Sequence, residues 1–142
     1  MPKSTITFLD VEHGDCSVIQ TSLGKTIIID GGGQKSDDIE DVGTYIIYPY
    51  LKYNKINEID VVIVTHPDND HIKGVLEVID KVKIKKIILP KGKIENDDKY
   101  VEIENACKVK NIELEKICEG YNFCVDEFEF YCIYPFDDVD DY

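Results

Sequence analysis

The sequence predicts a mixed α/β fold, in which helices pack on a sheet that contains both antiparallel and parallel strands. The chain has 142 residues, 43% of them hydrophobic, which is enough for one domain with a substantial core. Short apolar runs come first in adjacent pairs, and the later ones alternate with segments of helical periodicity. Paired strands followed by strand–helix alternation are typical of a mixed sheet whose later strands are joined by helices.

Three strands are expected within the first thirty residues. TITFLDVE (5–12) and DCSVIQTS (15–22) have strand-like composition and are joined through His-Gly, and Gly24 in the following turn suits a positive φ. The run KTIIID (25–30) predicts a third strand, which three consecutive glycines terminate. A helix is expected over 37–54, and Pro49 is expected to kink it or to mark a restart.

The second half of the chain alternates strands and helices. EIDVVIVTH (58–66) contains four consecutive apolar residues, as in a strand that is buried on both faces. The other expected elements are helices over 71–82, despite Gly74, and 97–111, and strands over 83–90, 112–117 and 127–135.

The charge of the chain bears on its possible partners. The formal net charge is −13 and the sequence contains no arginine, the side chain that most often holds phosphates bidentately. The overall field would therefore repel nucleic acid unless metal ions or a local basic patch offset it. One such lysine patch exists and comprises Lys81, Lys83, Lys85, Lys86, Lys91 and Lys93. Instead of a basic patch that binds a polyanion, these lysines could form a solvated strand edge.

The cysteines and the hydropathy favour a cytoplasmic protein. Five cysteines, an odd number without a close CxxC pair, are typical of reduced thiols and do not favour a disulfide framework or a cysteine-based zinc knuckle. No run of 18 apolar residues is present, so no membrane span is expected. The first residues also lack the pattern of a secretory signal.

The stretch THPDNDHIKG (65–74) contains the strongest chemical signal. His66, Asp68, Asp70 and His71 fall within six positions, after a buried strand and before a helix, where a turn lets several side chains converge. Imidazoles and carboxylates together suit Zn²⁺, Mn²⁺ or Fe²⁺. We therefore predict a divalent metal site that holds one or two ions, Zn or Mn.

Two other interpretations of this stretch compete with a metal site. A calcium-binding EF-hand loop is excluded, because Ile72 and Lys73 stand where an oxygen ligand and a glycine would be needed. Asp70 could instead cap the helix beside a surface histidine, with Asp68 in an Asx-turn.

The same stretch resembles the second motif of the metallo-β-lactamase superfamily, HxHxDH, in the variant HxDxDH. FLDVEHGDCSVIQ and TIIIDGGG resemble the opening of the hydrolase domain of ComEC-type DNA-uptake competence proteins. The resemblance covers about residues 5 to 90 and implies an αββα sandwich. Because no later histidine and no Gly-Asp pair follow residue 71, residues 1–142 are expected to be a single domain of this fold, its N-terminal αβ half, and incomplete at the C-terminus.

The resemblance also implies roles for individual residues. His66 and Asp68 would face a first metal position, and the carboxylate of Asp68 in place of histidine favours Mn²⁺ over Zn²⁺ there. Asp70 and His71 would face a second position, and Asp70 would act catalytically by orienting the attacking water.

Three residues before the motif are expected to support it. Asp30 would brace the metal loop without binding the metal. His13 and Asp15 would lie near the substrate or support Asp30, although a simple turn at this point is the alternative. The glycine run 31–33 could let the backbone approach a phosphate, or could serve only as a flexible connector.

The predicted function is a metal-dependent hydrolase that uses a metal-activated water, phosphodiesterase-like or nuclease-like. The alternatives are a catalytically incomplete metal-binding module that acts through protein interaction, and a hydrolase of another ester, a thioester or a lactam. The predicted substrate is a small-molecule or nucleic-acid phosphodiester. All four candidate ligands come from one loop, so a second copy of the chain or a C-terminal half is expected to complete the site.

Overall fold

A six-stranded mixed sheet forms the centre of the computed structural model, which describes residues 2–33, 41–92 and 97–136. Strands β1 to β3 pair antiparallel and β3 to β6 pair parallel, in the spatial order β1-β2-β3-β4-β5-β6. This arrangement confirms the predicted mixed sheet. The strands are β1 Thr5–Phe8, β2 Ser17–Gln20, β3 Thr26–Ile29, β4 Glu58–Ile63, β5 Lys83–Pro90 and β6 Glu113–Ile117.

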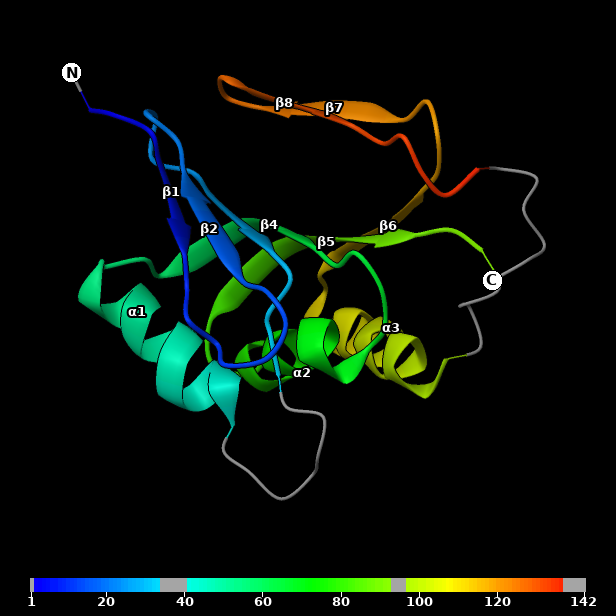
Figure 1. Cartoon of the computed structure of the whole chain (residues 1–142), viewed down its shortest axis with the longest axis horizontal. Coiled ribbons are helices and arrows are strands. Elements are labelled where there is room, and N and C mark those ends of the chain that lie inside the picture. Colours follow the sequence, from blue (N-terminus) through cyan, green and yellow to red (C-terminus); the bar gives the residue numbers. More distant parts are fainter. Residues whose placement is uncertain (1, 34–40, 93–96, 137–142) are drawn as a thin grey trace.

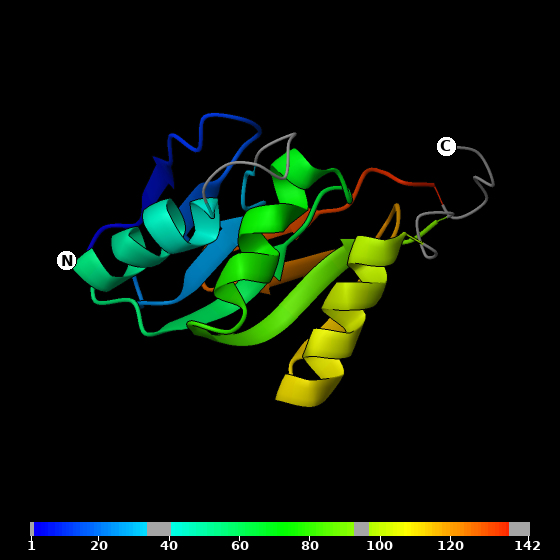
Figure 2. The same cartoon turned by 90° about the horizontal axis from the view of Figure 1, so that it is seen from below.

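The described helices cover one face of this sheet (Figures 1 and 2). They are the π-helix η1 Gly43–Ile47, α1 Tyr48–Tyr53, α2 Asn69–Val78 and α3 Asp98–Lys110. Of the helix predicted over 37–54, residues 37–40 lie outside the described residues, and the remainder changes from π to α geometry at Tyr48. Pro49 lies in the first turn of α1, directly after this change of geometry, so the proline marks a restart of the helix. None of the described helices is long and apolar enough to cross a membrane.

A two-stranded hairpin, β7 Asn122–Val125 and β8 Phe128–Tyr131, covers part of the opposite face (Figure 1). Val125 packs there in a buried cluster with Ile19, Ile27, Val61 and Ile88 of the main sheet. The chain therefore forms three layers: helices, a mixed sheet and a small second sheet. The sequence did not reveal β7, because the two-residue turn is Asp126-Glu127 and lacks the glycine that usually marks a tight hairpin.

The lysine patch does not lie at a strand edge, which corrects one interpretation of the sequence. β5 pairs with β4 on one side and β6 on the other, so its lysines project from an interior strand. The Lys85 Nζ lies 2.8 Å from the Asp60 carboxylate and also pairs with Glu58, and the Lys86 Nζ lies 3.2 Å from the Glu113 carboxylate. These neighbouring acids compensate much of the positive charge, so the described part of the patch is not a continuous basic surface.

Candidate metal centre

The loop that carries the histidines lies at the carboxyl end of β4, next to the carboxyl end of β3. β3 and β4 are parallel neighbours, and the Asp30 N–H donates to the Ile63 carbonyl at 2.8 Å directly after both strands end. Thr65 to Asp68 then lead into α2, which begins at Asn69 and so includes Asp70 and His71 in its first turn. This edge of a parallel sheet is where α/β folds place their sites.

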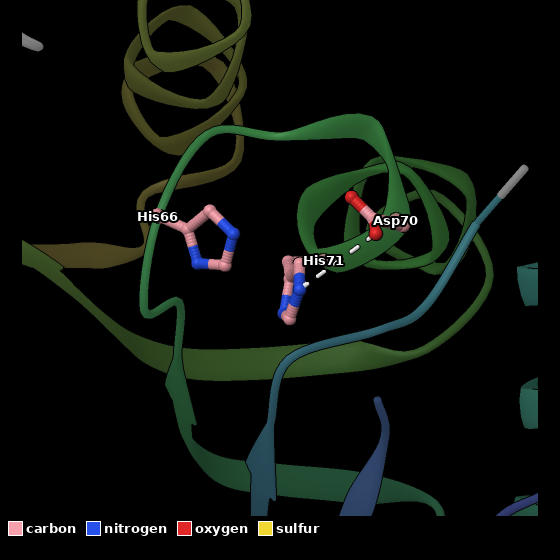
Figure 3. A group of neighbouring side chains, drawn as sticks. All are labelled: His66, Asp70 and His71. Atoms are coloured by element: carbon pink, nitrogen blue, oxygen red, sulfur yellow. Dashed lines mark ion pairs between the residues drawn. The ribbon is translucent and has the colours of Figure 1, made fainter. Parts of the chain in front are cut away.

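Three side chains converge in front of this loop: His66, Asp70 and His71 (Figure 3). Each offers one ligand atom, and these atoms all lie within 4.8 Å of one another. The two imidazole rings are 3.8 Å apart at their centroids, and the Asp70 carboxylate lies 4.0 Å from the His71 Nε2. Two imidazole nitrogens and a carboxylate form a donor set that suits a divalent transition metal. The predicted site therefore has three side chains in place to hold a metal ion.

The buried carboxylate of Asp30 orients both histidines. Asp30 is only 3% exposed, and its Oδ2 lies 2.9 Å from the His71 Nδ1. The same Oδ2 accepts a 2.6 Å hydrogen bond from the Thr65 hydroxyl, whose oxygen lies 2.9 Å from the His66 Nδ1. These contacts are all satisfied when each histidine is protonated on Nδ1, which leaves both Nε2 lone pairs available to a metal.

Asp68 lies at the edge of this group. Its side chain is 73% exposed, and its Oδ2 is 3.6 Å from the His66 Nε2. Asp68 is the N-cap residue of α2 but its side chain makes no capping hydrogen bond, and Asp70 lies inside the helix, so the helix-cap interpretation of Asp70 does not hold. The role of Asp68 as a metal ligand stays a prediction.

The loop of His13 to Asp15 packs against the metal loop through its backbone. The Asp15 carbonyl accepts from the Gly32 N–H at 2.8 Å, and a Cβ on Gly14 would lie 1.6 Å from the Asp70 carbonyl oxygen. The side chains of His13 and Asp15 are exposed and are not part of the three-residue group. The loop thus lies next to the site, and its contact with substrate stays a prediction.

The glycine run is neither a flexible connector nor an open phosphate cradle. Gly31 to Gly33 are buried, the Gly31 N–H donates to the His71 carbonyl at 2.7 Å, and the Gly74 N–H donates to the Gly32 carbonyl at 3.0 Å. A Cβ on Gly74 would lie 1.9 Å from the Gly31 carbonyl oxygen. The glycines therefore let the backbone after β3 lie directly on α2 and fix the helix that carries Asp70 and His71.

Sequence reasoning missed two residues near the site. Thr65 connects Asp30 to His66, and its only sequence signal is a hydroxyl directly before the first histidine. Tyr100 of α3 is 1% exposed, and its hydroxyl has no hydrogen-bond partner among the described residues. Burial and then the charges of Asp30, Asp97 and Asp68 raise the pKa of this phenol. Nothing in the sequence indicated that α3 would reach this position.

Cys16 is buried and is not suited to nucleophilic chemistry. Its side chain is 2% exposed. Burial, together with the charge of Asp30, raises the pKa of the thiol to about 12, so the thiol stays protonated at neutral pH.

Comparison with known proteins agrees with this geometry. The family model described as Metallo-beta-lactamase superfamily matches residues 9–117. The chain belongs to the metallo-β-lactamase superfamily. Members of this superfamily usually bind divalent metals, and the His66, Asp70 and His71 group is a possible site for one.

One curated relative extends the comparison. ComE operon protein 3 of Bacillus subtilis (strain 168) is 23% identical over 140 residues, which is 92% of this chain and 18% of that protein. The chain therefore spans less than a fifth of the length of this relative. The similarity supports the competence-protein branch that the sequence motifs indicate.

Proposed function

We propose that this metallo-β-lactamase-like chain is a metal-dependent phosphodiesterase. The observation that carries the proposal is the convergence of His66, Asp70 and His71, with both imidazoles oriented by Asp30. Ligands that are held in place before the ion arrives lose less conformational entropy on binding, so such a group favours metal affinity.

The residues of the site would have different roles. The Nε2 atoms of His66 and His71 and the carboxylate of Asp70 would hold a divalent cation, with Asp68 near enough to His66 to add an oxygen ligand. When bound, the cation supplies an activated water and neutralises charge that develops on the substrate. Asp70 would accept a hydrogen bond from the attacking water, and Asp30 would keep the imidazoles in the orientation that binds metal.

A mixed nitrogen and oxygen donor set favours Zn²⁺ or Mn²⁺, and involvement of Asp68 would favour Mn²⁺. The net charge of −13 favours a small phosphodiester over a long polyanion. The resemblance to competence-type proteins favours a nucleotide-derived substrate.

A second candidate is a metal-binding module that another polypeptide completes. Among the described residues, the three-residue ligand group comes from the single stretch 66–71, whereas catalytic two-metal sites draw ligands from several separated loops. This arrangement supports a site to which a second copy of the chain or a further segment contributes.

Metal content and turnover test the proposal together. The purified chain, loaded with Zn²⁺ or Mn²⁺ and freed of excess metal, is expected to retain about one ion per chain and to hydrolyse bis(4-nitrophenyl) phosphate. Asp70→Asn and His66→Ala are expected to lose both properties. Glu102→Gln is the matched carboxylate-to-amide control, because Glu102 lies exposed on α3, and it is expected to behave like the parent chain.

Two results would contradict the proposal in different ways. Bound metal without turnover of the phosphodiester would favour the metal-binding module. Metal content that stays unchanged in both His66→Ala and Asp70→Asn would show that this group is not the metal site.

A further inference from the structure

An apolar cavity of about 310 Å³ opens beside the metal group, on the side of His66 and Asp68. Its walls are formed mainly by Pro67, Pro90, Tyr134 and Pro135. We call this cavity the Tyr134 slot. It brings together the loop after β4, the end of β5 and the segment after β8, three parts of the chain that are far apart in the sequence.

The Tyr134 slot continues into a second cavity. This second cavity, of about 320 Å³, shares Thr65, Pro90 and Tyr134 with the slot and lies between the main sheet and the β7–β8 hairpin. Its further lining is largely aliphatic and aromatic, with Ile88, Phe123 and Phe130 among the residues. The metal group therefore stands at the end of an extended apolar surface.

The lining of the slot favours a flat, uncharged group. Proline and tyrosine rings present flat apolar faces, and the half-exposed Tyr134 ring packs edge-on against Phe136 with their centroids 5.5 Å apart. The residues that line the slot include no lysine, and its one carboxylate, Asp68, and its one imidazole, His66, lie at the end next to the metal group. An anionic chain would find no compensating charge along these walls.

The slot itself has the size of a small group. Its volume of about 310 Å³ is at the lower end of the range for small-molecule sites, so it suits one ring system, and a larger occupant would extend into the second cavity. A ring in the slot lies next to His66, so an ester attached to that ring would reach the candidate metal ligands.

We propose that the Tyr134 slot binds an uncharged aromatic ring of the substrate, so that the site acts on small aryl or nucleoside phosphoesters. This inference rests on the proposed phosphodiesterase function for the position of the ester, and on the slot itself for the ring. Tyr134 is then the residue that selects ring-bearing substrates.

Binding measurements test this without requiring turnover. With Zn²⁺ present, heteronuclear NMR titrations follow the amide signals of Thr65 and Tyr134 as 4-nitrophenyl phosphate, thymidine 5′-monophosphate, methyl phosphate or octyl phosphate is added. We expect at least one ring-bearing probe to bind about threefold or more tighter than methyl phosphate, which has the same charged group without a ring.

Variants of tyrosine locate the effect. Tyr134→Ala is expected to weaken the binding of the ring-bearing probes by about three- to tenfold and to leave the affinity for methyl phosphate unchanged. Tyr134→Phe is expected to retain the affinity for the ring-bearing probes. Tyr53→Ala, at an exposed tyrosine on α1, is the matched control and is expected to change nothing. The dispersion of the amide spectrum shows whether each variant is folded.

Three outcomes would overturn the inference. Methyl phosphate could bind as tightly as the ring-bearing probes, Tyr134→Ala could leave the affinity for the ring-bearing probes intact, or octyl phosphate could bind more tightly than the ring-bearing probes and methyl phosphate. The last result would assign the slot to an aliphatic chain. Ring-selective binding of these probes without hydrolysis of bis(4-nitrophenyl) phosphate would contradict the proposed function and leave the slot in place, so the two failures can be told apart.

Discussion

The hydroxyl of Thr65 links Asp30 to His66, and Thr65→Val removes this link while almost preserving the shape of the side chain. The change deletes the 2.6 Å hydrogen bond to the Asp30 Oδ2 and the 2.9 Å contact with the His66 Nδ1. The Thr65 N–H still donates to the Asp30 Oδ1 at 2.7 Å, and the His71 Nδ1 still contacts Asp30. The perturbation is therefore confined to one of the two histidines.

The expected magnitude follows from the burial of Asp30. Its carboxylate is 3% exposed and loses one of the three hydrogen bonds described here, a loss that costs about 1.5–3 kcal/mol when the acceptor is charged. His66 at the same time loses the acceptor that holds its proton on Nδ1. Removal of such a supporting hydrogen bond typically weakens metal binding about 10- to 100-fold.

Three measurements on Thr65→Val and Thr65→Ser check this reasoning. Urea unfolding gives the change in the free energy of unfolding, competition with a chromophoric chelator gives the Zn²⁺ affinity, and long-range proton–nitrogen NMR gives the tautomer of each histidine in the metal-free chain. Thr65→Ser keeps the hydroxyl and is expected to stay close to the parent chain in all three. If Thr65→Val bound Zn²⁺ as tightly as Thr65→Ser, the link between Asp30 and His66 would have no part in metal binding.

Two further predictions concern the helix that carries the site. Burial raises the pKa of Glu77 from its ordinary value of 4.5 to about 7, and the carboxylate of Asp41 contributes, so between these two pH values the folded chain binds a proton there that the unfolded chain has lost. The free energy of unfolding should therefore fall as pH rises from about 4.5 to 7 and then level off. Urea unfolding of Glu77→Gln at several pH values should show a smaller slope. An unchanged slope would contradict a raised pKa at Glu77. Gly74→Ala should lower the free energy of unfolding by about 3 kcal/mol, because the added methyl group would clash with Gly31. In the control Gly24→Ala the methyl group meets no atom within 4 Å, and only the φ of +90° at Gly24 should cost stability, about 1–2 kcal/mol. Equal losses of stability in the two variants would exclude the clash.

Much of the fold could be predicted from local patterns. The consecutive apolar residues of β4 indicated burial on both faces, and Val61 and Val62 indeed belong to the two different core clusters on either side of the sheet. The boundaries were less accurate: α2 begins at Asn69, two residues before the predicted start, because the Asp68 carbonyl already accepts hydrogen bonds from His71 and Ile72.

The errors have a common cause. The lysines of β5 resemble a solvated strand edge, since a charged side chain in isolation indicates exposure. In the structure β4 and β6 pair on either side of β5, and acids of both strands neutralise these lysines. The short strand β7 carries no turn signal of its own and is held by packing of Val125 and the aromatic residues on the main sheet. Both features depend on partners that lie far away in the sequence.

The sequence by itself determined the chemistry of the site, since the spacing of His66, Asp70 and His71 after a buried strand is a property of one short segment. The tertiary structure decided how that segment is held. Asp30 reaches the histidines only because β3 and β4 are parallel neighbours whose carboxyl ends meet, and the glycines at 31 and 74 matter only where two backbones touch. The Tyr134 slot likewise exists only where the chain after β8 returns to the metal loop. Hydrogen bonds and close packing between distant segments act through space, and the order of residues along the chain does not record these distances.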